Sequence, residues 1–134
     1  LIKDAASGGE ISRLTLITKS LVASAIPLPT LIFDEIDSGV SGDVALKMGN
    51  ILRKLSNRHQ VVSINHSPQL ASYGDYHFCV TKNQLAKLTE TQVTFLEKKE
   101  SQVEELARML SGAEITQEAR AAAEVLLEYK PRAK

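Results

Sequence analysis

The feature that most constrains the fold is a short apolar run that ends in two adjacent carboxylates. Leu31–Phe33 have the β-branched and aromatic character of a strand buried on both faces, and Asp34 and Glu35 follow directly. Ionised carboxylates are costly to remove from water, and the carboxyl ends of parallel strands are where open α/β sheets bind ligands. The run therefore predicts a strand whose end serves a cation or a reaction, typical of a magnesium-nucleotide site.

Hydrophobic periodicity predicts alternating strands and helices along the rest of the chain. Strands are expected at about residues 30–35, 60–64 and 76–81, and an antiparallel pair at about 85–88 and 91–96. Helices are expected before Pro27, after Gly42, at about 68–72, up to Gly112, and from Thr116 to Pro131.

Two of the predicted helices have a clear apolar face. The face of the first is expected to consist of Ile11, Leu14, Ile17, Leu21 and Val22. The face of the second is expected to consist of Val44, Ala45, Met48, Ile51, Leu52 and Leu55.

This order of elements predicts an α/β fold with a mostly parallel sheet and flanking helices. The 134 residues suffice for one domain, so residues 1–134 are expected to form a single unit. A right-handed crossover would place the ends of the strands near residues 35 and 65 side by side. Asp34, Glu35 and His66 are then expected to converge on one rim of the sheet.

The composition excludes some classes of function. The formal net charge is zero, so the chain has no overall attraction for nucleic acid or an anionic membrane. No window approaches the roughly 18 apolar residues of a membrane span, and no membrane partner is expected. The single cysteine, Cys79, suits a reducing compartment and hence the cytoplasm. Since the chain opens on Leu1 without a Met, we expect it to be a piece of a longer protein.

The segment Ser7-Gly8-Gly9-Glu10 has two interpretations. Ser-x-x-Glu is a capping box, which satisfies free amides at the start of a helix and needs no ligand. Two consecutive glycines also let bare backbone approach a phosphate at a helix N-terminus. The two roles can coexist.

The acidic strand end has a chemical and a structural interpretation. In the first, Asp34 binds Mg²⁺ through water and Glu35 orients or deprotonates the water that attacks a terminal phosphate. In the second, both are exposed turn residues. His66 could likewise donate a hydrogen bond to a phosphate oxygen or be merely structural. The loop of Asp37 and Ser38 could be an interface loop or a plain turn.

One motif is missing from the chain. No Gly-Lys dipeptide occurs, so these residues contain no phosphate-cradling P-loop. A complete ATP site would need that loop from a preceding segment or from another chain.

The order of these motifs resembles the second half of an ABC-type ATPase head. Within that superfamily the chain resembles RecN, the SMC-like family of bacterial DNA double-strand-break repair proteins. The segments that carry the resemblance are Ala6–Arg13, Pro29–Gly42, His59–Val62, His66–Ala71 and Val103–Gly112.

The resemblance implies a role for each motif. Ser7–Glu10 would be the signature motif, which contacts the terminal phosphate of ATP held by the opposite head. Asp34 would be the Walker B magnesium residue, Glu35 the catalytic carboxylate and His66 the switch histidine. Residues 37–38 would lie in the D-loop of the same ATP-binding site.

The resemblance also implies the partners. The chain would be the C-terminal lobe of a head that pairs with its own N-terminal P-loop half. Two such heads would form a homodimer with ATP and Mg²⁺ between them. The complete protein would act on DNA in repair and recombination, in the cytoplasm at the nucleoid, whereas this chain alone would be inactive. The alternatives are the motor of an ABC transporter and a non-catalytic dimerisation module.

Overall fold

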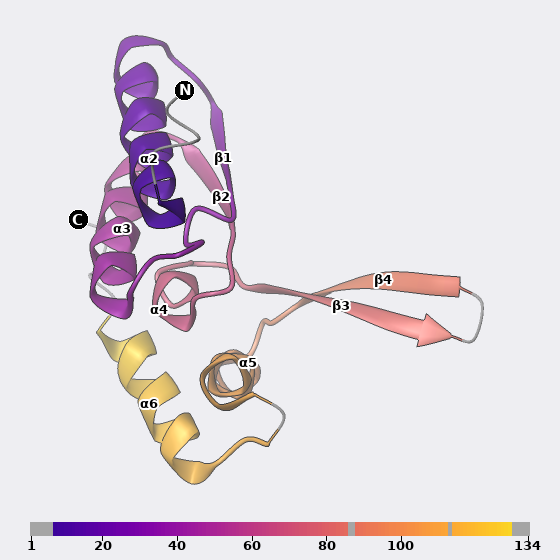
Figure 1. Ribbon diagram of the computed structural model, residues 1–134. Helices are drawn as coiled ribbons and strands as arrows, with labels where there is room; N and C mark the ends of the chain where they lie inside the picture. Colours follow the sequence, from indigo (N-terminus) through magenta and orange to yellow (C-terminus); the bar gives the residue numbers. More distant parts are fainter. Residues whose placement is uncertain (1–6, 86–87, 113, 130–134) are drawn as a thin grey trace.

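The structure is a computed structural model that describes residues 7–85, 88–112 and 114–129 (Figure 1). Its elements, in chain order, are α2 (Gly8–Ala25), β1 (Thr30–Asp34), α3 (Gly42–Leu55), β2 (Gln60–Ile64), α4 (Pro68–Ala71), β3 (Phe78–Leu85), β4 (Leu88–Phe95), α5 (Lys99–Ser111) and α6 (Gln117–Glu128).

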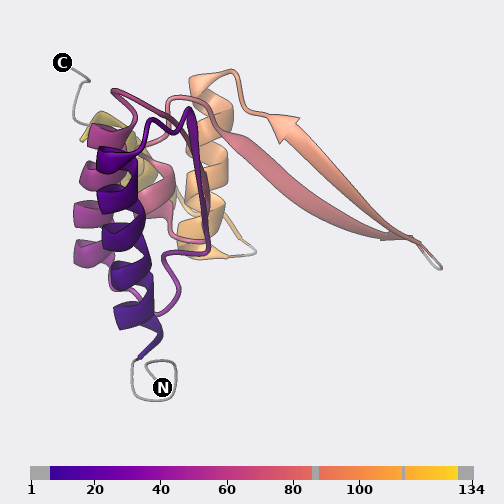
Figure 2. The ribbon, with the colours of Figure 1, turned by 90° about the horizontal axis from the view of Figure 1, so that it is seen from above.

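The first half of the chain forms the α/β layer that the sequence predicts. Strands β1 and β2 pair in parallel, with Thr30 opposite Gln60 and Asp34 opposite Ile64. Helices α2 and α3 lie side by side against one face of this pair (Figures 1 and 2). The core between them consists of Leu16, Ala23, Leu31, Phe33, Ile36, Met48, Leu52 and Leu70.

The prediction that β1 is buried on both faces is wrong. Burial alternates along the strand: Leu31 and Phe33 point into the core, whereas Ile32 is 56% exposed. On the neighbouring strand, Val62 and Ile64 are exposed in the same way. Since α2 and α3 cover one face only, the opposite apolar face of this pair is open in the described residues.

The predicted face of α2 is also wrong, apart from the half-buried Ile11. Its buried residues are Gly9, Ser12, Leu16 and Ala23, while Leu14, Ile17, Leu21 and Val22 are exposed. The small residues Gly9 and Ser12 face inward because the start of the helix packs against backbone of the loop after β1. Periodicity located the helix but not the side that packs.

The predictions for α3, β2 and α4 are confirmed. Ala45, Met48 and Leu52 of α3 are buried, Val44 and Leu55 pack against the core, and Ile51 is more exposed than expected. Strand β2 has the predicted bounds. Helix α4 begins at Pro68, and the Ser67 side chain accepts a hydrogen bond from the Leu70 amide.

Strands β3 and β4 form one long antiparallel pair instead of a third strand of the sheet followed by a separate pair. β3 pairs with β4 from Phe78 opposite Phe95 to Leu85 opposite Leu88, and in the described residues neither strand pairs with β1 or β2. The hairpin extends away from the helices (Figure 1). Exposed rings of Phe78 and Phe95 stack across it, with centroids 5.1 Å apart.

Helices α5 and α6 pack on each other around a second cluster of Val103, Leu106, Ala107, Ala119 and Ala123. The predicted end of α5 and start of α6 are present, and the predicted end of the last helix at Pro131 lies outside the described residues. Gly112, with a φ of +81°, ends α5, and the Thr116 hydroxyl accepts from the Ala119 amide at 3.1 Å to cap α6. Within the described ranges, no helix is both long and apolar enough to cross a bilayer.

Candidate functional site

The rim at the carboxyl end of β1 and β2 brings Glu35 and His66 together. Glu35 Oε1 lies 3.3 Å from His66 Nε2, and the two side chains are 63% and 79% exposed. An ionised carboxylate can only accept, so Nε2–H is the donor. The parallel register produces this contact, because residues that follow paired strand ends lie on the same edge.

Glu35 adopts a backbone conformation that is uncommon for a residue with a side chain. Its φ is +48°, in the left-handed region, while its amide still donates to the Ile64 carbonyl oxygen at 2.9 Å. The cost of this conformation, about 1–3 kcal/mol for non-glycine residues, is typical of functional turns. The turn directs the Glu35 side chain toward the rim.

Asp34 is the last residue of β1 and is exposed. Mg²⁺ in nucleotide sites keeps several waters and takes one or two carboxylates plus phosphate oxygens, so one exposed carboxylate at a strand end fits that donor set. Among the described residues, no three His, Cys, Asp or Glu side chains cluster as a metal cage.

Asp37 lies under the rim rather than on it. It is only 9% exposed, and its Oδ2 accepts the backbone amides of His66 at 2.7 Å and Ser67 at 2.5 Å. Its Oδ1 is buried and has no hydrogen-bond partner in the part of the chain that the structure describes. Sequence reasoning placed Asp37 near nucleotide and did not anticipate this link to the loop after β2.

The start of α2 packs closely against the loop after β1. The buried hydroxyl of Ser12 lies 3.0 Å from the Gly8 carbonyl oxygen and 3.1 Å from that of Ser38. A Cβ on Gly9 would lie 2.5 Å from the Gly39 carbonyl oxygen. Ser12 was not identified from the sequence, although a serine in the middle of an apolar helix face was the available signal.

The capping box predicted at the start of α2 is present. Glu10 Oε2 accepts from the Ser7 amide at 2.8 Å, and this backbone hydrogen bond is the main cause of the lowered pKa of the Glu10 carboxyl. Ser7 and Gly8 are exposed at the helix end. Within the part of the chain that the structure describes, the exposed Ser7 and Gly8 backbone at this helix N-terminus suits contact with an anion, while Glu10 is engaged with Ser7.

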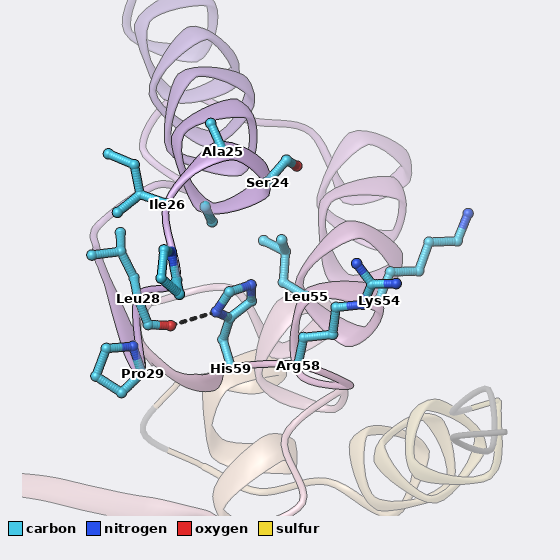
Figure 3. A pocket seen from close by; sticks show the side chains of 11 residues that line it. Ser24, Ala25, Ile26, Leu28, Pro29, Lys54, Leu55, Arg58 and His59 are labelled. Carbon is cyan, nitrogen blue, oxygen red and sulfur yellow. Dashed lines mark hydrogen bonds between the residues drawn. The ribbon is translucent and has the colours of Figure 1, made fainter.

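A pocket of about 560 Å³ lies at the other end of the strands (Figure 3). Residues 23–29, 54–55 and 58–59 line it, including Lys54, Arg58 and His59. His59 Nδ1 donates to the Leu28 carbonyl oxygen at 2.6 Å. His59 thus ties the segment before β1 to the segment before β2. This pocket is remote from Glu35 and His66, since it lies where the strands begin.

No family model matches the chain. It is 46% identical over 123 residues to the DNA repair protein RecN of Haemophilus influenzae. It is 48% identical over 126 residues to that of Rickettsia conorii and 43% identical over 127 residues to that of Streptomyces coelicolor. These matches cover 92–95% of the chain but only 22–23% of the length of the relatives.

The fold resembles a chain from structural work on ATP-driven dimerization and DNA-stimulated activation of SMC ATPases. The TM-score is 0.57 and the identity 21%, over 77% of this chain and 63% of the other. The resemblance to RecN is therefore confirmed along nearly the whole sequence. The α/β fold of the chain is similar to the fold of this structural neighbour.

Proposed function

Because this chain matches one segment of RecN proteins along nearly all of its length, we propose that it is the C-terminal lobe of an SMC-like ATPase head. The complete protein would hydrolyse ATP between two engaged heads and act in DNA double-strand-break repair and recombination, in the cytoplasm. The RecN names of the relatives support the repair assignment, and the SMC-like fold supports the head.

In this proposal the rim carries the hydrolytic chemistry. Asp34 holds Mg²⁺, which supplies charge stabilisation for the phosphates of ATP. Glu35 orients or deprotonates the attacking water, and His66 donates a hydrogen bond toward the terminal phosphate. The observation that carries this assignment is the 3.3 Å contact between Glu35 and His66, two exposed polar side chains from different strands.

The remaining candidate residues would face a second head. Ser7 and Gly8 are exposed at the start of α2, which suits contact with a phosphate bound by the opposite P-loop, whereas Gly9 is buried and would support this turn from within. Glu10 supports this turn through its bond to Ser7. Ser38 lies in the loop against which α2 packs, so the D-loop and the signature motif would move as one piece.

The test is Glu35→Gln in the complete protein. The amide cannot act as a base, so ATP turnover should fall by about 10²-fold or more while ATP binding is retained. Two engaged heads should then persist, which size-exclusion chromatography with ATP can measure. Cells that carry only this variant should lose resistance to double-strand breaks.

A matched control is Glu114→Gln, which makes the same change at an exposed glutamate between α5 and α6. It should turn over ATP at the unaltered rate. If Glu35→Gln turned over ATP at the unaltered rate, Glu35 would not be the residue that orients or deprotonates the attacking water. Normal turnover with transport of a solute by reconstituted vesicles would favour a transporter motor instead.

The P-loop requirement gives a second test. The 134 residues produced alone should not hydrolyse ATP, and co-expression with the preceding part of the protein should restore turnover. Robust hydrolysis by the 134 residues alone would contradict the assignment of all the motifs.

A further inference from the structure

We propose that Asp37 is a positioning residue that holds His66 opposite Glu35, an inference that rests on the proposed ATPase function. Its carboxylate is buried and binds two consecutive amides, those of His66 and Ser67. It therefore acts through His66 and does not itself touch the nucleotide.

The surroundings of His66 make this anchor important. Its side chain is 79% exposed, so packing does not hold it in place. The side-chain contact that the structure describes for it is the one to Glu35. The orientation of His66 consequently depends on where its backbone is fixed, and its amide donates to Asp37 Oδ2 at 2.7 Å.

Asp37 also belongs to the turn that shapes Glu35. The Ser38 amide donates to the Glu35 carbonyl oxygen at 3.2 Å, and the Val40 amide donates to that of Asp37 at 3.1 Å. One side chain thus joins the turn after β1, which carries Glu35, to the loop after β2, which carries His66. A displacement of either loop is transmitted to the other.

The experiment measures ATP turnover by the complete protein with Asp37→Ala, Asp37→Asn, His66→Ala and the double variant Asp37→Ala/His66→Ala. Asp37→Ala should lower kcat about as much as His66→Ala, by about 10- to 100-fold, and change the KM for ATP less than twofold. Because the two residues act as a unit, the double variant should be no more than threefold slower than His66→Ala. Asp37→Asn keeps an oxygen that can accept hydrogen bonds from both amides, so its kcat should be at least tenfold higher than that of Asp37→Ala.

Asp43→Ala is the control, since it removes an exposed aspartate from the first turn of α3 without touching either loop. Its turnover should match that of the unaltered protein. Circular dichroism and Tm identify any variant that fails to fold. If Asp37→Ala does not fold, Asp37→Asn is compared with His66→Ala instead: Asp37→Asn should be the faster of the two, and an equally slow Asp37→Asn variant would overturn the proposal.

Additive losses in the double variant would overturn the proposal, because they would mean that Asp37 acts independently of His66. An Asp37→Asn variant as slow as Asp37→Ala would also overturn it, because turnover would then depend on the negative charge of Asp37 and not on its bonds to the two amides. If neither Glu35→Gln nor His66→Ala lowers turnover, the proposed function fails. If both do and Asp37→Ala does not, only the positioning role fails.

Discussion

The two ends of the β1–β2 pair each carry a histidine, and the two histidines are held in opposite ways. At the amino end, half-buried His59 donates to the Leu28 carbonyl oxygen and so links the segment before β1 to the segment before β2 (Figure 3). At the carboxyl end, His66 is exposed and meets the side chain of Glu35. The side chain of His59 is bound to backbone, whereas the side chains of His66 and Glu35 are both exposed to solvent. Placement in the sheet, rather than residue type, separates the structural histidine from the candidate catalytic one.

The largest expected effect comes from exchanging each histidine for alanine in the complete protein. His66→Ala should lower ATP turnover by about 10- to 100-fold and leave the free energy of unfolding nearly unchanged, because its ring is exposed. His59→Ala should leave turnover within twofold and lower the free energy of unfolding by about 1–2 kcal/mol, through loss of the bond to Leu28. Steady-state kinetics and urea denaturation measure both. Slower turnover in His59→Ala together with a lower free energy of unfolding in His66→Ala would contradict this distinction between the two histidines.

A second pair of variants tests how closely backbone packs at the carboxyl end. Gly9→Ala would put a Cβ 2.5 Å from the Gly39 carbonyl oxygen, so we expect a loss of roughly 1–3 kcal/mol in the free energy of unfolding. Gly8→Ala is the matched control, since its Cβ would lie 3.8 Å from the nearest atom, the Ser38 carbonyl oxygen. Equal stability of the two variants in urea denaturation would contradict the packing of α2 on this loop.

Ser12→Ala tests the packing of α2 on the loop after β1 with a smaller change. It removes a buried hydroxyl that lies within hydrogen-bond distance of the Gly8 and Ser38 carbonyl oxygens. We expect a loss of about 1 kcal/mol in the free energy of unfolding. Ser24→Ala, an exposed serine near the end of the same helix, is the control and should cost less.

The smallest expected effect is on pH dependence. The bond from the Ser7 amide lowers the pKa of Glu10 in the folded chain, so this bond contributes stability above the unfolded pKa. That contribution is lost as the pH falls through the lowered folded pKa. Glu10→Gln should therefore flatten the acid limb of a plot of Tm against pH. An unchanged acid limb would mean that Glu10 does not hold the helix start.

Most element positions followed from local patterns. Pro27 and Pro29 end the first helix, Gly112 with its positive φ ends α5, and Thr116 caps α6, because each residue imposes its own backbone preference. The proximity of Glu35 and His66 was also predictable, since parallel pairing places strand ends together. The RecN resemblance rested on the same short motifs.

Which faces are buried was not predictable in the same way. Leu14, Ile17 and Leu21 form a regular apolar stripe on α2, yet the helix packs through Gly9, Ser12 and Leu16. A periodic stripe shows that a helix has an apolar side but not which neighbour will meet it. The bounds of β3 and β4 were predicted wrongly for a related reason. The extent of a strand depends on the strand that pairs with it, and local sequence does not show which strand that is.

The sequence by itself determined where the helices and the two parallel strands begin and most of them end, and which chemical groups follow those two strands. These properties depend on residues close together in the chain. Only the tertiary structure decided that Asp37 is buried beneath His66, that Ser12 and Gly9 lie against the Ser38–Gly39 loop, and that one face of the sheet is open. Those facts depend on contacts between residues about 30 positions apart, which local preferences do not encode.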